Sequence, residues 1–94
     1  MNNLEIKNAL STEIIRLLDD KYSGGARLPE LVADITEWAL KNNISTSGLA
    51  DDVVEIVESE ENPIIDCVWY PWRGKRKIFV FLSYELVHIT SRSQ

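Results

Sequence analysis

Few residues in this chain of 94 amino acids could do covalent or metal chemistry. It has one cysteine, Cys67, and one histidine, His88. A thiol needs a neighbouring base to act as a nucleophile at neutral pH, so nucleophilic catalysis would require the fold to bring these two residues together. One His and one Cys cannot close a zinc site, and the carboxylates lack the spacing of a calcium loop. The sequence therefore predicts no enzyme, no metal and no cofactor.

The densest group of binding side chains lies in the stretch 63–83, PIIDCVWYPWRGKRKIFVFLS. Its polar tip carries one tryptophan and four cations: Trp72, Arg73, Lys75, Arg76 and Lys77. An aromatic ring among cations is the composition that stacks a nucleic-acid base or contacts phosphates. Edge strands also carry Lys and Arg because these side chains prevent aggregation. The composition predicts either a nucleic-acid contact or a protected edge.

A second group of charged side chains is acidic and precedes this stretch. Asp51, Asp52, Glu55 and Glu58 fall on the outer side of a predicted helix. Such a row is typical of a solvated helix face, and it also suits a partner protein with a basic surface, whose approach it would steer. In that interpretation Trp69 and Trp72 supply the aromatic anchors of the interface. An acid and base pair of carboxylates would need a cleft, which the sequence does not indicate.

The net charge of −5 hides a division along the chain. Residues 1–72 have a net charge of −9, whereas residues 73–94 have a net charge of +4. An acidic body repels nucleic acid everywhere except near the basic end. We expect any nucleic-acid contact to be confined to residues 72–77.

Length and composition predict one soluble domain over residues 1–94. The apolar fraction of 45% and the charged fraction of 27% are those of globular proteins. No apolar run reaches the roughly 18 residues that span a bilayer, and the N-terminus lacks the features of a signal peptide. We therefore expect a cytoplasmic protein without a membrane partner.

Hydrophobic spacing predicts an α+β fold of three helices followed by an antiparallel β-hairpin. Apolar residues recur at three- and four-residue intervals in the predicted helices 4–22, 29–43 and 49–59, which form a helical part over 4–61. Pro29 would open the second helix, and the stretch Ser45-Thr46-Ser47-Gly48 offers several N-cap candidates for the third. The side chains of Glu13 and Asp34 are expected to face water.

The hairpin occupies residues 63–83, with predicted arms at 64–70 and 76–83 and a five-residue connection at 71–75. Both arms carry apolar residues on both faces, unlike a half-solvated sheet. The helices can cover one face, so a partner protein or a second copy of the chain is expected to cover part of the other. The tail 84–94 could add a strand or a helical turn.

The element order resembles that of the winged helix superfamily. LPELVADITEWALKNNISTSGLADDVVEIVE is similar to its helix-turn-helix, and IIDCVWYPWRGKRKIFVFL is similar to its wing. The resemblance implies a helix that enters the DNA major groove and a wing that touches flanking phosphates. This chain departs from the pattern because its third helix presents carboxylates, which repel phosphates. Only the wing would then suit nucleic acid.

Two functions follow as hypotheses. The first is a non-catalytic module that regulates or inhibits a basic protein partner through the acidic helix and the aromatic hairpin. The second is a nucleic-acid-binding transcriptional regulator that uses the basic tip as a wing. Small acidic chains of this kind are common among phage and mobile-element products, which is an analogy and not an identification. A homodimer through the hairpin is compatible with both.

Overall fold

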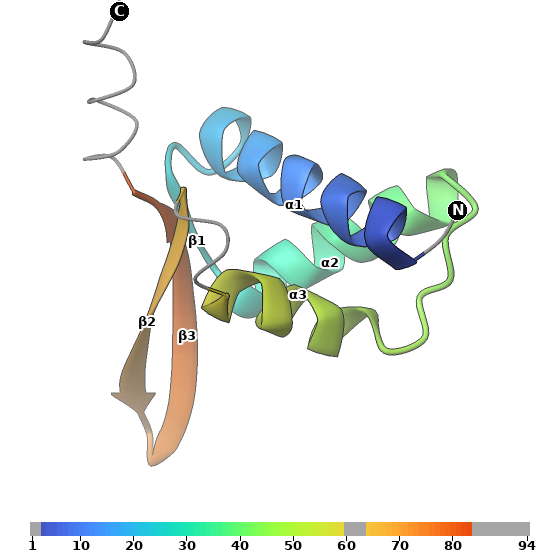
Figure 1. Ribbon diagram of the computed structural model, residues 1–94. Coiled ribbons are helices and arrows are strands. Elements are labelled where there is room, and N and C mark those ends of the chain that lie inside the picture. Colours follow the sequence, from blue (N-terminus) through green and yellow to red (C-terminus); the bar gives the residue numbers. More distant parts are fainter. Residues whose placement is uncertain (1–2, 60–63, 84–94) are drawn as a thin grey trace, which may run out of the picture.

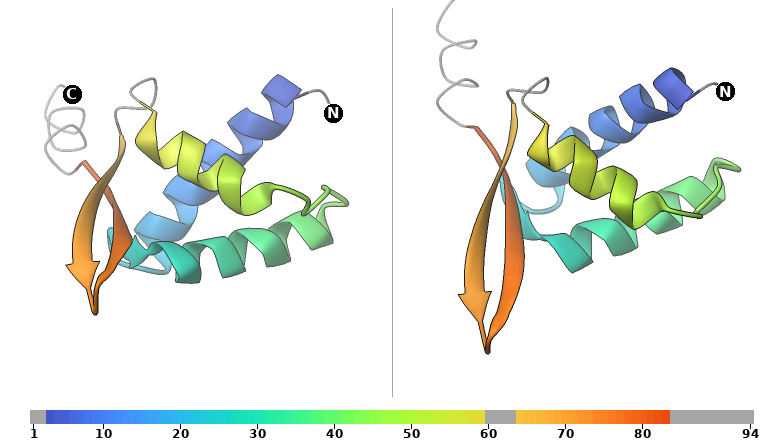
Figure 2. Two further views of the ribbon diagram at one scale, coloured as in Figure 1. Left: turned by 90° about the horizontal axis from the view of Figure 1, so that it is seen from below. Right: turned by 60° about the horizontal axis from the view of Figure 1, so that its bottom comes forward.

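A computed structural model describes residues 3–59 and 64–83. Within these residues three helices precede an antiparallel hairpin, which confirms the predicted α+β class (Figure 1). The elements in chain order are α1 (Asn3–Asp20), β1 (Gly25–Arg27), α2 (Leu28–Lys41), α3 (Leu49–Glu58), β2 (Ile65–Trp72) and β3 (Lys75–Leu82). The helices pack together beside the sheet, and the far end of the β2–β3 hairpin extends past them (Figure 2).

The helices form because each carries an apolar stripe that recurs at helical spacing and faces the same core. The buried residues of these stripes are Leu10, Ile14, Leu17 and Leu18 in α1, Leu31, Ile35 and Ala39 in α2, and Leu49, Val53, Ile56 and Val57 in α3. On the sheet, Val80 faces this core and is fully buried. None of the helices in the described ranges has the length and apolar content of a membrane span.

α3 begins at Leu49, directly after the stretch that was predicted to hold its N-cap. Gly48 precedes the helix in the left-handed conformation, with φ of 70°, and no side chain caps the first turn. The Ser45 hydroxyl instead accepts a hydrogen bond from the Ser47 amide at 3.3 Å, while the Thr46 carbonyl accepts one from the Leu49 amide at 3.2 Å. The N-cap therefore lies within the predicted stretch, and it is the glycine and not one of the three hydroxyl residues.

The sheet contains a strand that the sequence analysis did not predict. The three-residue β1 pairs antiparallel with β3, placing Gly25 opposite Phe81 and Arg27 opposite Phe79, and the strand order is β1-β3-β2. A three-residue strand is too short to show a period of two, so its sequence gives no signal. β1 ties the connection between α1 and α2 to the hairpin.

The hairpin turn is also tighter than predicted. Its loop is the pair Arg73-Gly74, with positive φ angles of 51° and 75°, so residues on both sides of this pair belong to the strands. Two positive φ angles are typical of the type I′ turn, whose twist matches that of paired strands. Pro71 lies in β2 opposite Arg76. Proline is tolerated here because β2 is an edge strand and needs no outward amide.

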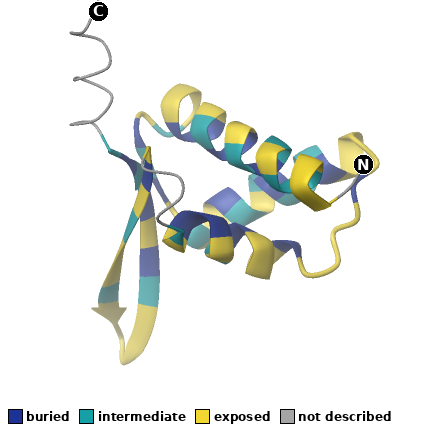
Figure 3. Cartoon of the chain, in the orientation of Figure 1, coloured by how far each residue is buried: buried dark blue, intermediate teal, exposed yellow. Residues whose placement is uncertain are grey.

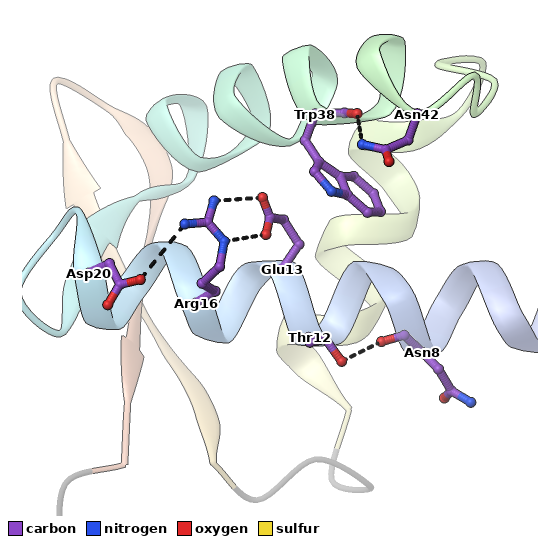
Figure 4. A network of polar contacts seen from close by, with 7 residues as sticks. All are labelled: Asn8, Thr12, Glu13, Arg16, Asp20, Trp38 and Asn42. Carbon is purple, nitrogen blue, oxygen red and sulfur yellow. Dashed lines mark hydrogen bonds and ion pairs between the residues drawn. The ribbon is translucent and has the colours of Figure 1, made fainter.

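Two carboxylates that were expected to face water are partly withdrawn from it. Glu13 is buried, and its two carboxylate oxygens accept hydrogen bonds from the Arg16 guanidinium at 2.6 and 2.8 Å (Figure 4). The same guanidinium forms an ion pair with Asp20 at 3.7 Å. Asp34 is half-buried and accepts a hydrogen bond from the Tyr22 hydroxyl. These predictions were wrong because helical spacing alone does not show how neighbouring helices and connections cover a surface position.

Candidate protein-interaction surfaces

The first candidate surface is the acidic face of α3, which consists of Asp51, Asp52, Glu55 and Glu58. All four residues are exposed, because the buried stripe of α3 lies on the opposite side of the helix (Figure 3). Asp51 and Asp52 belong to the first turn, where the helix dipole favours negative charge. In the described part of the chain only Glu55 has an ion pair, with its Oε1 3.5 Å from Lys7 Nζ of α1. The acidic face is therefore largely free to interact with an external cation.

The second candidate surface is the basic tip, which consists of Trp72, Arg73, Lys75, Arg76 and Lys77. The Arg73 guanidinium lies 5.7 Å from the centre of the Trp72 ring, and that of Arg76 lies 4.5 Å from the centre of the Trp69 ring. None of the four cations forms an ion pair with a residue of the described ranges. Within residues 3–59 and 64–83, the contacts of these cations that the structure shows are therefore those with aromatic rings.

The two tryptophans predicted as partner anchors lie on opposite faces of the hairpin. Trp69 is opposite the buried Ile78 and therefore points to the inner face, where the helices lie. Trp72 is opposite Lys75 and points to the outer face. One flat partner surface cannot cover both rings, so the predicted partner-binding residues divide into two sets. Trp69 lies beside Arg76 on the face where the helices lie, and Trp72 lies on the outer face.

Cys67 marks the place where the inner face meets α3. It follows Ile65 along the inner side of β2, and Glu58 of α3 lies near enough to affect its thiol. Burial, together with the charges of Glu58 and Asp66, raises the pKa of the Cys67 thiol. A thiol with a raised pKa is a weak nucleophile at neutral pH. His88, the base that nucleophilic catalysis by Cys67 would require, lies outside the described residues.

The outer face of the sheet is partly apolar and remains uncovered by the described residues. Val68 is 49% exposed, Trp72 58% and Phe79 36%. They border an open hollow of about 720 Å³, whose rim includes Arg27 and Glu30. The sequence analysis did not identify these rim residues because it did not predict β1. The outer face was recognisable in part, from the apolar residues on both sides of the arms.

Gly25 has a packing role on this outer face. A methyl group at its position would lie 2.7 Å from the tip of the Phe79 ring, so the ring occupies the space that a side chain would need. The absence of a side chain lets the aromatic ring lie directly on β1. Gly25 therefore helps to hold Phe79 on the surface beside the hollow.

The described residues provide charged and aromatic surfaces. Among residues 3–59 and 64–83, no cluster of His, Cys, Asp and Glu could hold a metal ion. No protein-family model, curated protein or solved structure matches the chain. The winged helix resemblance accordingly stays a prediction.

Proposed function

We propose that this chain is a non-catalytic interaction module that binds a basic surface on a protein partner. The acidic face of α3 would make the charged contact, and Trp69 on the inner face of the hairpin would supply the aromatic anchor. The observation that carries the proposal is the row of exposed carboxylates on α3, of which only Glu55 has an ion pair within the described residues.

The position of Trp69 supports the same surface. Its side chain is 41% exposed and lies on the strand that contacts α3. Burial of a large aromatic side chain beside a charged row is the usual composition of a binding hot spot with a polar rim. A regulator or inhibitor of the partner needs no chemistry beyond this contact, since occupying the basic surface is sufficient.

The decisive variant reverses two carboxylates that have no ion pair in the described part of the chain, Asp51→Lys with Glu58→Lys. We expect it to capture the partner from nuclease-treated lysate at least about tenfold less efficiently, because each contact becomes repulsive. Capture is quantified by mass spectrometry with the unmodified chain as reference. Equal recovery of the same partner would contradict the proposal.

A matched control carries the same change in net charge elsewhere. Asp19→Lys with Glu30→Lys again alters one carboxylate near a helix C-terminus and one in a first helical turn. Both residues are exposed and lie outside α3. The control should retain partner binding within about twofold, because electrostatic effects at a distance are screened by salt. Thermal unfolding of both variants shows whether each is folded.

Binding of nucleic acid through the basic tip is the second candidate function. It is favoured by the four cations without ion pairs among the described residues and by the exposure of the neighbouring Trp72. The acidic face would lie away from the nucleic acid, because carboxylates facing phosphates weaken binding. In this candidate the hairpin acts as a wing without a DNA-reading helix.

Substitution of single lysines tests the second candidate. Lys75→Ala and Lys77→Ala should each weaken binding to duplex or single-stranded probes and reduce its dependence on salt by about one unit of slope. Lys41→Ala, on α2, is the matched control and should change neither quantity. Gel retardation or fluorescence anisotropy at several salt concentrations measures the binding affinity and its dependence on salt. If the unmodified chain retards no probe at low salt, the candidate is rejected.

A further inference from the structure

The fold holds two complementary surfaces apart within one molecule. α3 contacts the start of β2 through its C-terminal end, whereas the basic tip lies at the other end of the same strand. No ion pair among the described residues joins the acidic face to the basic tip. Pairing with β1 and the shared core fix the direction of the hairpin. One molecule therefore cannot bring its own opposite charges together, but two molecules can.

We infer that the chain forms a two-fold symmetric dimer in which the basic tip of each copy lies on the acidic face of the other. Each copy offers four carboxylates on α3 and four cations at the tip. Arg76 lies on the inner face beside Trp69, whereas Lys75 and Lys77 lie on the outer face, so Arg76 makes the charged contact that accompanies Trp69. The lengths of the two charged stretches match. Asp51 and Glu58 are about 10 Å apart along the helix, and the strand from Lys75 to Lys77 with its turn spans about 10 Å.

Apolar contacts can support this charged contact. Trp69 projects from the inner face of the hairpin, which is the side on which the helices lie. On α3, Ala50 is exposed and Val54 is half-buried beside the carboxylates. Trp69 of one copy can cover these small apolar side chains of the other, so that the charges surround a desolvated centre.

Two-fold symmetry follows from the presence of both surfaces on each copy. A reciprocal arrangement makes the same contact twice in one association and closes, whereas a one-way arrangement leaves a free tip and a free acidic face at its ends. Closure therefore leaves no tip and no acidic face unoccupied. The dimer also covers the surface assigned above to a foreign partner. If that proposed function holds, the tip of the second copy competes with the partner for α3.

Charge exchange between two variants tests the inference. Asp51→Lys with Glu58→Lys reverses two of the four carboxylates of the acidic face, and Lys75→Glu with Arg76→Glu reverses two of the four cations of the tip. We expect each variant to self-associate at least about tenfold more weakly than the unmodified chain, because every reciprocal contact contains two repulsive pairs. In a heterodimer of the two variants, one interface joins an unmodified tip to an unmodified acidic face. The other interface joins the two substituted surfaces, so its charges are exchanged but again opposite. An equimolar mixture should therefore form a one-to-one heterodimer.

Sedimentation velocity after nuclease treatment, over a range of concentrations and salt, measures these species. Dimerisation of the unmodified chain should weaken as salt rises, since the contact is between exposed charges. The Asp19→Lys with Glu30→Lys variant should dimerise like the unmodified chain. A chain that stays monomeric at low salt would overturn the inference, as would variants that dimerise as well as the unmodified chain or a mixture that stays monomeric.

The test separates this inference from the proposed function. A chain that is monomeric at low salt but loses its foreign partner on reversal of the acidic face overturns the dimer and supports the proposed function. A chain that passes the charge-exchange test but captures the same proteins with and without the acidic-face reversal supports the dimer and contradicts the proposed function.

Discussion

Asp34 is the carboxylate in the described residues whose titration depends most clearly on the fold. It accepts a hydrogen bond from the Tyr22 hydroxyl at one oxygen and from Lys21 Nζ, at 2.9 Å, at the other. The hydrogen bond from Tyr22 lowers the pKa of Asp34, and partial burial opposes this without cancelling it. Burial raises the pKa of Tyr22, and its bond to Asp34 adds to the increase. The contact joins the end of α1 to the side of α2.

Loss of this hydrogen bond should destabilise the protein in a pH-dependent way. The pKa of Asp34 lies below its unfolded value of about 3.9, so the unfolded state binds the proton first as pH falls. The stabilisation is complete above the unfolded pKa and disappears as pH falls through the folded pKa. Tyr22→Phe should therefore reduce the free energy of unfolding by about 1 kcal/mol at pH 7 and by less in acid. Urea titrations of both proteins at neutral and acidic pH measure the difference.

The prediction is contradicted if Tyr22→Phe costs the same free energy at both pH values. Asp19→Asn is the control, because Asp19 is exposed. Its substitution should change the free energy of unfolding by less than about 0.5 kcal/mol at either pH.

At the scale of elements, the hairpin depends on a turn whose backbone conformation is demanding. Gly74 has φ of 75°, and a methyl group added there would meet no atom within 4 Å. Any cost of Gly74→Ala is therefore conformational and not steric, and we expect the free energy of unfolding to fall by about 1 kcal/mol. Arg73, with φ of 51°, should show the opposite effect on substitution by asparagine, which tolerates this conformation better. Chemical denaturation of the two variants checks both signs.

Local hydrogen exchange provides the control for the turn. The amides of β2 and β3 near the turn should exchange faster in Gly74→Ala, while the amides of α1 keep protection relative to the global stability. Unchanged stability together with unchanged exchange in the hairpin would show that the turn does not adopt this conformation.

Long periodic elements were predictable from the sequence, and short or contextual ones were not. α1 and α3 have stripes of three or more buried residues, so their spacing was sufficient to place them. β1 has three residues and exists because β3 offers it a partner, which no local pattern reveals. The Arg73-Gly74 turn was placed in a longer loop because Pro71 and Trp72 read as loop residues, although the edge position of β2 accommodates both.

At the scale of the whole molecule, the sequence predicted the charges of the two surfaces but not their relation. The division between an acidic body and a basic end is visible in the order of residues. The separation of the acidic face from the basic tip depends on how α3 meets β2, and the placement of Trp69 and Trp72 on opposite faces depends on register. These are tertiary properties, so composition and spacing could name the residues without grouping them correctly.

Because the core residues are buried and the candidate binding residues are exposed, we expect stability and binding to depend on different residues. Ile35 is fully buried in the core, and Ile35→Ala should cost about 2–5 kcal/mol through lost contacts and a cavity. A chain of 94 residues is expected to have a total stability of roughly 5–14 kcal/mol, so this change removes a large share of it. Trp72 is 58% exposed at the tip, and Trp72→Ala should change stability by less than about 0.5 kcal/mol.

Thermal and urea unfolding measure both variants under the same conditions. A large loss of stability in Trp72→Ala would mean that the tip belongs to the folding unit, and its exposed ring would then need no partner to explain it. With the expected small loss, the large aromatic surface of Trp72 contributes little to folding. Its exposure then fits a contact with nucleic acid at the tip, which is the second candidate function, better than a role in the fold.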